Sequence, residues 1–301
     1  MALALKIHPE AWRILDCEPE VIQDLLRSAL EKHRRLLSVG TESVLKDSPE
    51  SAVTLVDAPG FPRVCVKELR WRGWLHAFKG IFRLTQGIRS YRNGWKLREA
   101  GFGVASPMAL ITDRRWGLIR SEWVVMEVIP GAVELDRYIV KRTADMWPPE
   151  EKVALARLFG RFIGSMHGAG IFHSDLKTCN VLVSEEPAQS NNPPDAGGQT
   201  SNKATSPRKA LRFSLLDYDN VRFSRQVPWR RKIKNLVQIF LSTPVAIDAT
   251  HRMLFLNEYA LHAGLNPNEK REAARAIIEA ARGKQILYVG IDGDVREKWW
   301  T

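Results

Sequence analysis

HSDLKTCNVLV, residues 173–183, decides the fold class of this chain. The stretch sets Asp175, Lys177 and Asn180 directly before an apolar run. Transfer of a phosphoryl group to a hydroxyl uses a carboxylate that accepts the hydroxyl proton, a cation that neutralises the moving group and an oxygen donor that holds a metal. The spacing from Asp175 to Asn180 is that of a kinase catalytic loop. The alternative is a plain turn that His173 and Asp175 close and Asn180 caps.

A second acidic motif, SLLDYDN (214–220), lies further along the chain. A carboxylate just beyond a buried strand has rigid support and one side open to a metal. Asp217 comes directly after Leu215 and Leu216, so it is the predicted metal ligand together with Asn180. Asp219 is predicted to face elsewhere.

The segment between these motifs, 185–209, has a different composition. It is crowded with Pro, Gly, Ser and Asn and nearly free of large apolar residues. Such a composition cannot bury enough surface to order itself, which predicts a disordered hairpin insertion.

Two earlier stretches predict a nucleotide site. In RVCVKEL (63–69), Lys67 follows an alternating apolar strand, where it can reach the α- and β-phosphates of ATP. EWVVMEVI (122–129) is a continuous apolar run typical of a buried strand. There Met126 would back the adenine, a role compatible with plain core packing, and the backbone from Glu127 to Ile129 would bond its edge.

The remaining pattern predicts the architecture. Helical spacing covers 18–37, 88–100 and 150–170, and the chain from 229 to 296 is mostly helical. Strands come first and helices follow, which indicates an α+β, bilobal fold with a small β-rich N-lobe and a larger helical C-lobe. We expect a helical extension over 1–40, the N-lobe over 41–129 and the C-lobe over 130–301.

Composition indicates the class of protein and its cellular compartment. The chain has 301 residues, 45% hydrophobic and 26% charged, which is an ordinary globular mix. Cys17, Cys65 and Cys179 lack metal-ligand spacing and fit a reducing compartment. No apolar stretch approaches the length of a membrane span. We therefore expect a cytoplasmic protein.

With these motifs, the chain resembles the protein-kinase-like superfamily and, within it, the Kdo/WaaP lipopolysaccharide kinase family. The likeness spans roughly residues 41–260 and is carried by VCVKELRWRG (64–73), YRNGWKLREAGFGVASPMALI (91–111), LLDYDNVRF (215–223), NLVQIFLS (235–242) and FLNEY (255–259). The resemblance implies ATP and Mg²⁺ or Mn²⁺ as cofactors. It also implies a Kdo or heptose hydroxyl of the lipopolysaccharide inner core as acceptor.

The chain departs from the kinase pattern in several places. A polar turn with Ser48 and Ser51 stands where a glycine-rich loop would cover the phosphates. The helix glutamate expected to pair with Lys67 is not evident: Glu99 is the only acid between 69 and 112, and Ser90 lies nearer the expected place. No APE-like sequence follows Asp217. Because protein kinases use that segment as a peptide platform, its absence favours a compact acceptor such as a sugar.

The formal charge of +11 predicts an anionic partner. Basic residues fill 63–98, where Glu68 is the only acid and aromatic residues are interleaved, and WRRKIK (229–234) adds a second cluster. Such surfaces suit an anionic glycolipid and peripheral contact with the cytoplasmic face of the inner membrane. A solvated basic face with aromatics turned into the core is the alternative. Nucleic acid would fit the composition but is not the expected partner.

Three functions remain open from the sequence. The first is a lipopolysaccharide core sugar kinase. The second is a Ser/Thr or Tyr protein kinase, which the missing peptide platform disfavours. The third is a non-catalytic pseudokinase adaptor, which the joint presence of Lys67, Asp175, Asn180 and Asp217 disfavours.

Overall fold

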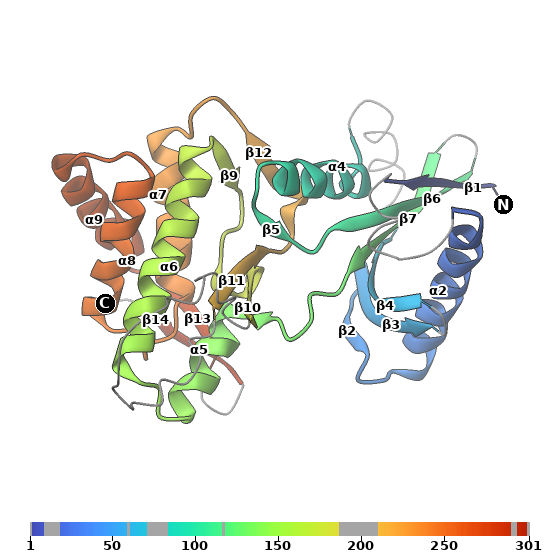
Figure 1. Cartoon of the computed structure of the whole chain (residues 1–301), viewed down its shortest axis with the longest axis horizontal. Coiled ribbons are helices and arrows are strands. Elements are labelled where there is room, and N and C mark those ends of the chain that lie inside the picture. Colours follow the sequence, from blue (N-terminus) through green and yellow to red (C-terminus); the bar gives the residue numbers. More distant parts are fainter. Residues whose placement is uncertain are drawn as a thin grey trace, which may run out of the picture. The chain divides into compact units, whose positions relative to one another are not determined.

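The structure is a computed structural model that describes residues 2–8, 19–58, 61–70, 84–115, 118–186, 210–289 and 294–299. It divides into two compact units, Met1–Ile129 with Leu215–Val221, and Pro130–Ser214 with Arg222–Thr301. The first unit is rich in strands and the second in helices (Figure 1). The expected α+β class is therefore confirmed.

An antiparallel sheet with strand order β1-β6-β7-β4-β3-β2 forms most of the first unit. Its strands are β1 (Ala2–Ile7), β2 (Val44–Asp47), β3 (Ser51–Ala58), β4 (Phe61–Leu69), β6 (Pro107–Arg115) and β7 (Leu118–Glu127), and a short β5 (Gly103–Val104) lies outside it. The strands predicted within 63–69 and 122–129 are confirmed by β4 and β7.

One face of this sheet is covered by α2 (Pro19–Val39), which runs beside β3 and β4 in Figure 1. Side chains alternate across a strand, so Val64 and Val66 point to this face together. They form one buried cluster with Val125 of β7 and with Ile22 and Leu26 of α2. The helix predicted over 18–37 is confirmed, because its apolar stripe has this core to bury against.

The other face of the sheet is only partly covered. The α4 helix (Gln86–Glu99) packs there, with Tyr91 and Trp95 buried against Leu110 of β6 and Val124 of β7. The helix predicted over 88–100 is thereby confirmed, starting two residues earlier than expected. The part of this face carried by β3 and β4 bears partly exposed side chains.

Five helices account for most of the second unit as described. They are α5 (Leu135–Ala144), α6 (Pro149–Gly168), α7 (Trp229–Ser242), α8 (Ala249–His262) and α9 (Pro267–Ala281). The α6 and α8 helices approach closely because α6 has glycine at the contact. A Cβ at Gly160 would lie 2.3 Å from the Phe255 carbonyl oxygen, and one at Gly164 would lie 2.6 Å from that of Tyr259.

Short strands and two 3₁₀ turns, η1 and η2, carry the motifs of the later chain. They are β8 (Val133–Glu134), β9 (Ile171–His173), η1 (Thr178–Asn180), β10 (Val181–Glu186), β11 (Ala210–Leu215), η2 (Tyr218–Asn220), β12 (Val221–Phe223), β13 (Gln285–Val289) and β14 (Val295–Trp299). Since β10 continues to Glu186, residues 185 and 186 are strand and not part of an insertion. The rest of the predicted insertion, 187–209, lies outside the described residues.

Several strands differ from the sequence-based expectation. Residues 2–7, predicted within a helical extension, form the edge strand β1. The β6 strand escaped prediction because Met108, Ala109, Leu110 and Ile111 are all buried and show no alternation. The region 229–296 is mostly helical, as expected, because it contains α7, α8 and α9, but it ends in the β13–β14 hairpin, which the sequence did not predict. No described helix combines the length and apolarity needed to cross a bilayer.

Candidate active site

In the first unit, the predicted site residues begin with Lys67. This residue lies on β4 and projects from the face opposite to α2. Cys65 shares that face, and strand pairing adds Val53, Leu55 and Met126. All five are only partly buried, in contrast to the fully buried residues that alternate with them. A partly open apolar surface with one cation suits an adenine ring and its phosphates.

Asp217 is the carboxylate that Lys67 contacts. The Lys67 ammonium donates to Asp217 Oδ1 in an ion pair. Asp217 follows β11 and has left-handed backbone angles, φ 49° and ψ 39°. Aspartate tolerates this conformation better than most residues, and such strain concentrates at functional sites. The Asp217 side chain is 56% exposed whereas that of Lys67 is 14% exposed, so the carboxylate is the open partner.

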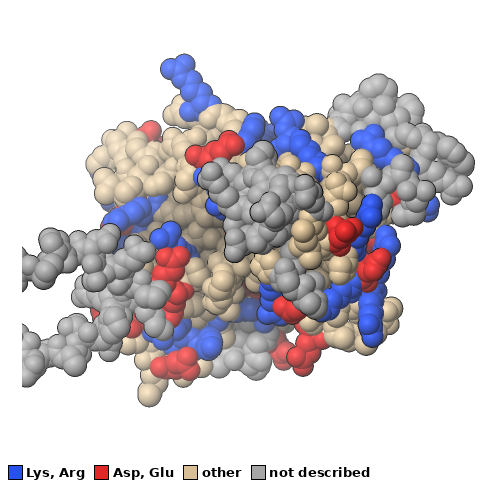
Figure 2. All heavy atoms as spheres, turned by 45° about the vertical axis from the view of Figure 1, so that its right-hand side comes forward, with Lys and Arg blue, Asp and Glu red and all other residues tan. Residues whose placement is uncertain are grey.

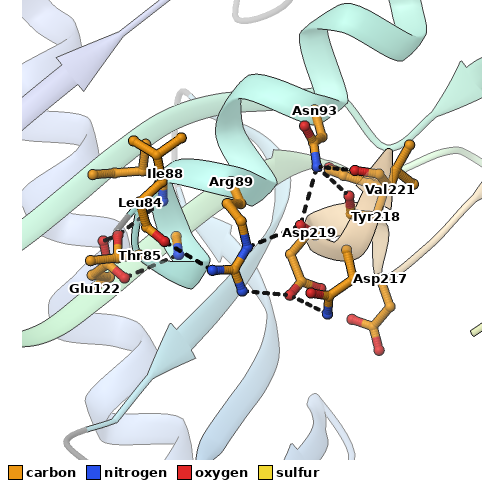
Figure 3. Close-up of polar contacts among 12 residues, drawn as sticks. Leu84, Thr85, Ile88, Arg89, Asn93, Glu122, Asp217, Tyr218, Asp219 and Val221 are labelled. Atoms are coloured by element: carbon orange, nitrogen blue, oxygen red, sulfur yellow. Dashed lines mark hydrogen bonds and ion pairs between the residues drawn. The ribbon is translucent and has the colours of Figure 1, made fainter. Parts of the chain in front are cut away.

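Asp219 lies in different surroundings, because Asp217 has left-handed backbone angles and Tyr218–Asn220 form the 3₁₀ turn η2. Its side chain is 4% exposed and lies 3.6 Å from an Arg89 guanidinium nitrogen. Asn220 Nδ2 donates to its Oδ2 at 2.8 Å. Burial raises the pKa of Asp219, and the positive charges of Lys67 and Arg89 oppose that rise. Figure 3 shows Asp219 turned toward α4 and Asp217 turned away from it. The metal-binding role of Asp217 stays a prediction.

The predicted adenine-binding residues lie at the end of β7. Met126 is partly buried against the α4 cluster, and its Sδ lies 3.4 Å from the Tyr218 hydroxyl. The Glu127 backbone N–H donates to the Ser106 carbonyl at 3.0 Å, and Glu127 Oε1 accepts from the Ser106 hydroxyl at 2.8 Å. The Glu127 N–H is therefore already used within the fold, and hydrogen bonding of the 127–129 backbone to an adenine edge stays a prediction.

Ser48 and Ser51 build the turn between β2 and β3. The Ser48 hydroxyl donates to the Ser51 carbonyl at 2.9 Å and accepts from the Ser51 N–H at 3.2 Å. Arg70 donates to the Ser48 carbonyl at 2.7 Å, and Ser51 is buried. Both serines thus have a structural role in the hairpin. Their contact with phosphate stays a prediction.

In the second unit, the predicted site residues are centred on Asp175, between β9 and η1. Its Oδ1 lies 3.2 Å from the Lys177 ammonium and accepts from Gln238 Nε2 at 3.3 Å. Asn180 Nδ2 donates to the Asp175 carbonyl at 2.8 Å, with its distance to Oδ2 longer at 3.4 Å. The predicted residues Asp175, Lys177 and Asn180 are therefore brought together. Asp175 is half exposed, as a group that meets a substrate must be.

One face of α7 holds this loop, and sequence reasoning missed it. Asn235, Gln238 and Ser242 lie three and then four residues apart, so they share a helix face. Asn235 Nδ2 donates to the His173 carbonyl at 2.6 Å, and Gln238 Nε2 donates to that of Ser174 at 3.1 Å. Ser242 Oγ accepts from the Thr178 N–H at 2.9 Å. The polar residues within the otherwise apolar stretch 235–242 were the available signal.

A buried chain of hydrogen bonds continues from this face into the helical core. Asn235 Oδ1 lies 3.1 Å from His167 Nε2, and His167 Nδ1 lies 2.9 Å from the Tyr259 hydroxyl. Asn235 already donates from Nδ2, so its Oδ1 accepts from His167 and Tyr259 donates to Nδ1. Burial lowers the pKa of His167 to about 4. His167 is therefore neutral at physiological pH, which this pattern of donors and acceptors requires.

The predicted metal ligands fit a hard cation. Asn180 uses its Nδ2 toward Asp175, so its Oδ1 is the atom that can face a metal. Asp217 supplies a carboxylate on an open side of its turn. Amide and carboxylate oxygens are the ligands that Mg²⁺ prefers.

Comparison with known proteins identifies the class and then the family. A solved structure of WaaP in complex with acyl carrier protein matches with a TM-score of 0.52 and 18% identity, over 91% of this chain and 99% of that chain. The fold is therefore protein-kinase-like. The model of the lipopolysaccharide kinase (Kdo/WaaP) family matches residues 82–253, more than half of the chain. The chain belongs to this family.

Two relatives extend the comparison. The chain is 23% identical over 212 residues to the lipopolysaccharide core heptose(I) kinase WaaP of Pseudomonas aeruginosa, a match that covers 68% of this chain and 71% of that protein. It is 37% identical over 98 residues to the KEOPS complex subunit Bud32 of Pyrococcus abyssi, which covers 32% of this chain and 40% of that protein. The chain is accordingly a phosphotransferase that acts on a sugar hydroxyl of lipopolysaccharide, and a protein kinase is not favoured.

Proposed function

We propose that this chain transfers the terminal phosphoryl group of ATP to a hydroxyl of Kdo or heptose in the lipopolysaccharide inner core. The observation that carries the proposal is the family match over 82–253, which includes Asp175, Asn180 and Asp217. The hydrogen bonds that hold the Asp175 carboxylate support its role as the group that meets the acceptor hydroxyl.

Each residue has a distinct task in this proposal. Lys67 binds the α- and β-phosphates, while Met126 and the backbone of Glu127 and Ile129 bind the adenine. The turn of Ser48 and Ser51 covers the phosphates. Asn180 and Asp217 hold Mg²⁺ or Mn²⁺, which neutralises charge on the phosphates when bound.

Asp175 and Lys177 act on the acceptor. Oδ1 of Asp175 accepts from Gln238 at 3.3 Å and lies 3.2 Å from the Lys177 ammonium, whereas Oδ2 has a longer contact of 3.4 Å with Asn180 Nδ2. Oδ2 is therefore the oxygen that accepts the hydroxyl proton. As that proton leaves, the hydroxyl oxygen forms its bond to phosphorus, and the bond from phosphorus to the bridging oxygen of ADP breaks. The Lys177 ammonium stabilises the negative charge of the moving group.

A transfer assay tests the proposal. The purified chain is given radiolabelled ATP, Mg²⁺ and a panel of acceptors that contain Kdo or heptose, with a generic protein substrate beside them. We expect label only on the glycolipid, and an Asp175→Asn variant slower on the order of 100- to 10,000-fold. Labelled protein without labelled sugar would disprove the proposed acceptor.

We also propose peripheral association with an anionic membrane surface. The proposal now rests on the cluster at 229–234 more than on 63–98, because most described basic residues of 63–98 have acidic partners. Arg63 pairs with Asp57, Lys67 with Asp217, Arg70 with Asp47 and Glu68, Arg89 with Asp219, and Arg98 with Glu127. Figure 2 likewise shows Lys and Arg interspersed with Asp and Glu over the face in view.

A further inference from the structure

The α4 helix stands where a kinase would carry a glutamate for Lys67, yet it has no such residue. Its acid, Glu99, is its exposed last residue, and Ser90 is buried. Arg89 and Asn93 are the α4 residues that contact the segment after Asp217. They lie four residues apart on one helix face and meet the turn that follows Asp217 (Figure 3).

Asn93 binds that turn through its backbone. Its Nδ2 lies 2.9 Å from the carbonyl oxygen of Tyr218, 3.1 Å from that of Asp219 and 3.2 Å from that of Val221. One amide group thus serves three acceptors within a four-residue segment. Buried carbonyls need donors, and this short turn cannot supply them by a regular ladder.

Arg89 binds the same turn one helical turn away. Its Nε donates to the Asp219 carbonyl at 3.2 Å, and a terminal nitrogen lies 3.6 Å from Asp219 Oδ2. Another terminal nitrogen donates to the Leu84 carbonyl at 2.9 Å, which fixes the guanidinium against the start of the helix. Asp219 is therefore a buried anchor for Arg89, with its charge compensated.

The helix itself is fixed in position. At its N-terminus, the Gly87 N–H donates to Glu122 Oε2 of β7 at 3.0 Å, and the Thr85 hydroxyl donates to the same carboxylate. At Gly94 a Cβ would lie 2.9 Å from the Tyr218 ring, so the turn packs directly on the helix backbone. The Tyr218 hydroxyl donates to the Ala105 carbonyl at 2.6 Å. These contacts thus hold the helix and the turn together.

We propose that Arg89 and Asn93 are positioning residues that hold Asp217 in its metal-binding placement. Asp217 begins the turn in a left-handed conformation and makes no side-chain capping hydrogen bond to it, so the contacts to the next residues keep Asp217 in place. In this chain α4 acts on the nucleotide site through the metal-binding carboxylate and not through a carboxylate paired with Lys67. The inference rests on the proposed function, in which Asp217 holds the metal.

Metal binding measured apart from turnover tests the inference. Mn²⁺ binding is followed by electron paramagnetic resonance with a non-hydrolysable ATP analogue present. Groups that orient a metal ligand typically contribute 10- to 100-fold in affinity. We therefore expect Asn93→Leu and Arg89→Met each to bind Mn²⁺ at least roughly tenfold more weakly than the parent protein does. Asn93→Gln, which keeps the amide donor, should recover part of the loss. Arg92→Met, on the exposed side of α4, is the matched control and should bind as the parent does.

The Asp217→Asn variant, measured in the same assay, distinguishes failure of the positioning role from failure of the metal-binding role. If Asp217→Asn weakens Mn²⁺ binding but Asn93→Leu and Arg89→Met do not, the positioning role is wrong and the metal-binding role of Asp217 stands. If Asp217→Asn has no effect, the metal-binding role is wrong and the inference falls with it. If the Asn93→Leu variant does not fold, the Arg89→Lys variant provides the test. Lysine keeps the positive charge but loses the forked contact of the guanidinium with Asp219. Unchanged Mn²⁺ affinity in Arg89→Lys would then overturn the inference.

Discussion

Gln238 fixes the rotation of the Asp175 carboxylate. Its Nε2 donates to Asp175 Oδ1 and to the Ser174 carbonyl, and its Oε1 accepts from the Leu176 N–H at 3.2 Å. A single amide thus contacts three successive residues of the catalytic loop. Lys177 contacts the same carboxylate from a half-exposed position, where solvent weakens its hold.

Replacing Gln238 by leucine should slow transfer while leaving ATP binding intact. Leucine keeps the volume and removes both the donor and the acceptor, so the carboxylate loses its orientation. Misplacing a reacting group costs roughly 10- to 100-fold, and we expect a loss of that size in kcat with KM for ATP unchanged. Gln226→Leu, at an exposed loop position, is the control. A Gln238→Leu enzyme of parental kcat would show that the contact does not orient the base.

The two acids of the DYD segment should respond differently to the same substitution. Asp217→Asn removes a charge from the predicted metal ligand, and asparagine accepts the left-handed backbone, so the fold should persist. Asp219→Asn alters a buried ion pair but keeps the backbone bond from Arg89. We expect Mg²⁺-dependent ATP binding, measured by titration calorimetry, to weaken far more in Asp217→Asn. A larger effect in Asp219→Asn would reverse the assignment.

At the scale of elements, the sequence predicted contacts between residues that are close in the chain and missed contacts between residues that are far apart in it. The spacing of Asp175, Lys177 and Asn180 lies within one loop, so the motif identified it. Gln238 lies 63 residues beyond Asp175, and Arg89 lies 130 residues before Asp219. Only the packed fold brings such pairs together, and no single-sequence pattern encodes that contact. The same limit made 63–98 look like an unpaired basic stretch, although Lys67, Arg89 and Arg98 have acidic partners at the end of β7 and in the turn after β11.

The ends of β10 and β11 bear on the predicted insertion. These strands are neighbours in one sheet, and Arg212 of β11 lies 2.5 Å from Glu186 of β10. Glu185 accepts from the Tyr138 hydroxyl at 2.9 Å, so it belongs to the packed part of the unit. A shortened connection should therefore begin after Glu186 and end before Ala210.

Replacing 187–209 with a four-residue Gly-rich turn should leave folding and turnover unchanged. The composition of 187–209 indicates that it buries little apolar surface. Shortening a loop of this length lowers the entropic free-energy cost of loop closure by only about 1 to 2 kcal/mol. We expect an equal or slightly higher Tm by calorimetry and a parental transfer rate. A Gly/Ser segment of native length is the control, since it changes composition without length. Loss of activity in both variants would show that the native segment has a role of its own.

At the scale of the whole molecule, the net charge of +11 needs an explanation that local pairing does not give. The first turns of α7 carry Arg230, Arg231 and Lys234, with no acid in the first turn. Positive side chains are unfavourable at a helix N-terminus because the helix dipole is positive there. Arg231 and Lys234 lie over the Phe172 ring at 5.3 and 5.8 Å. Because these positive side chains are unfavourable for the helix itself, we infer that the cluster binds an anion outside the chain.

Membrane association should depend on this cluster and on salt. Each Lys or Arg near an anionic leaflet contributes about 1 kcal/mol, so the double variant Arg230→Glu/Lys234→Glu should lower liposome binding by more than roughly tenfold. Arg275→Glu/Arg282→Glu on and after α9 makes the same change in charge elsewhere and should bind nearly as the parent does. Binding is measured by co-sedimentation with vesicles containing anionic lipid and with neutral vesicles. It should fall as salt rises, because the Debye length shrinks from about 10 Å at 0.1 M to about 3 Å at 1 M. Equal losses in both double variants would mean that total charge, and not the α7 cluster, governs the attraction. Salt-independent binding would instead point to an apolar contact and would disprove the electrostatic proposal.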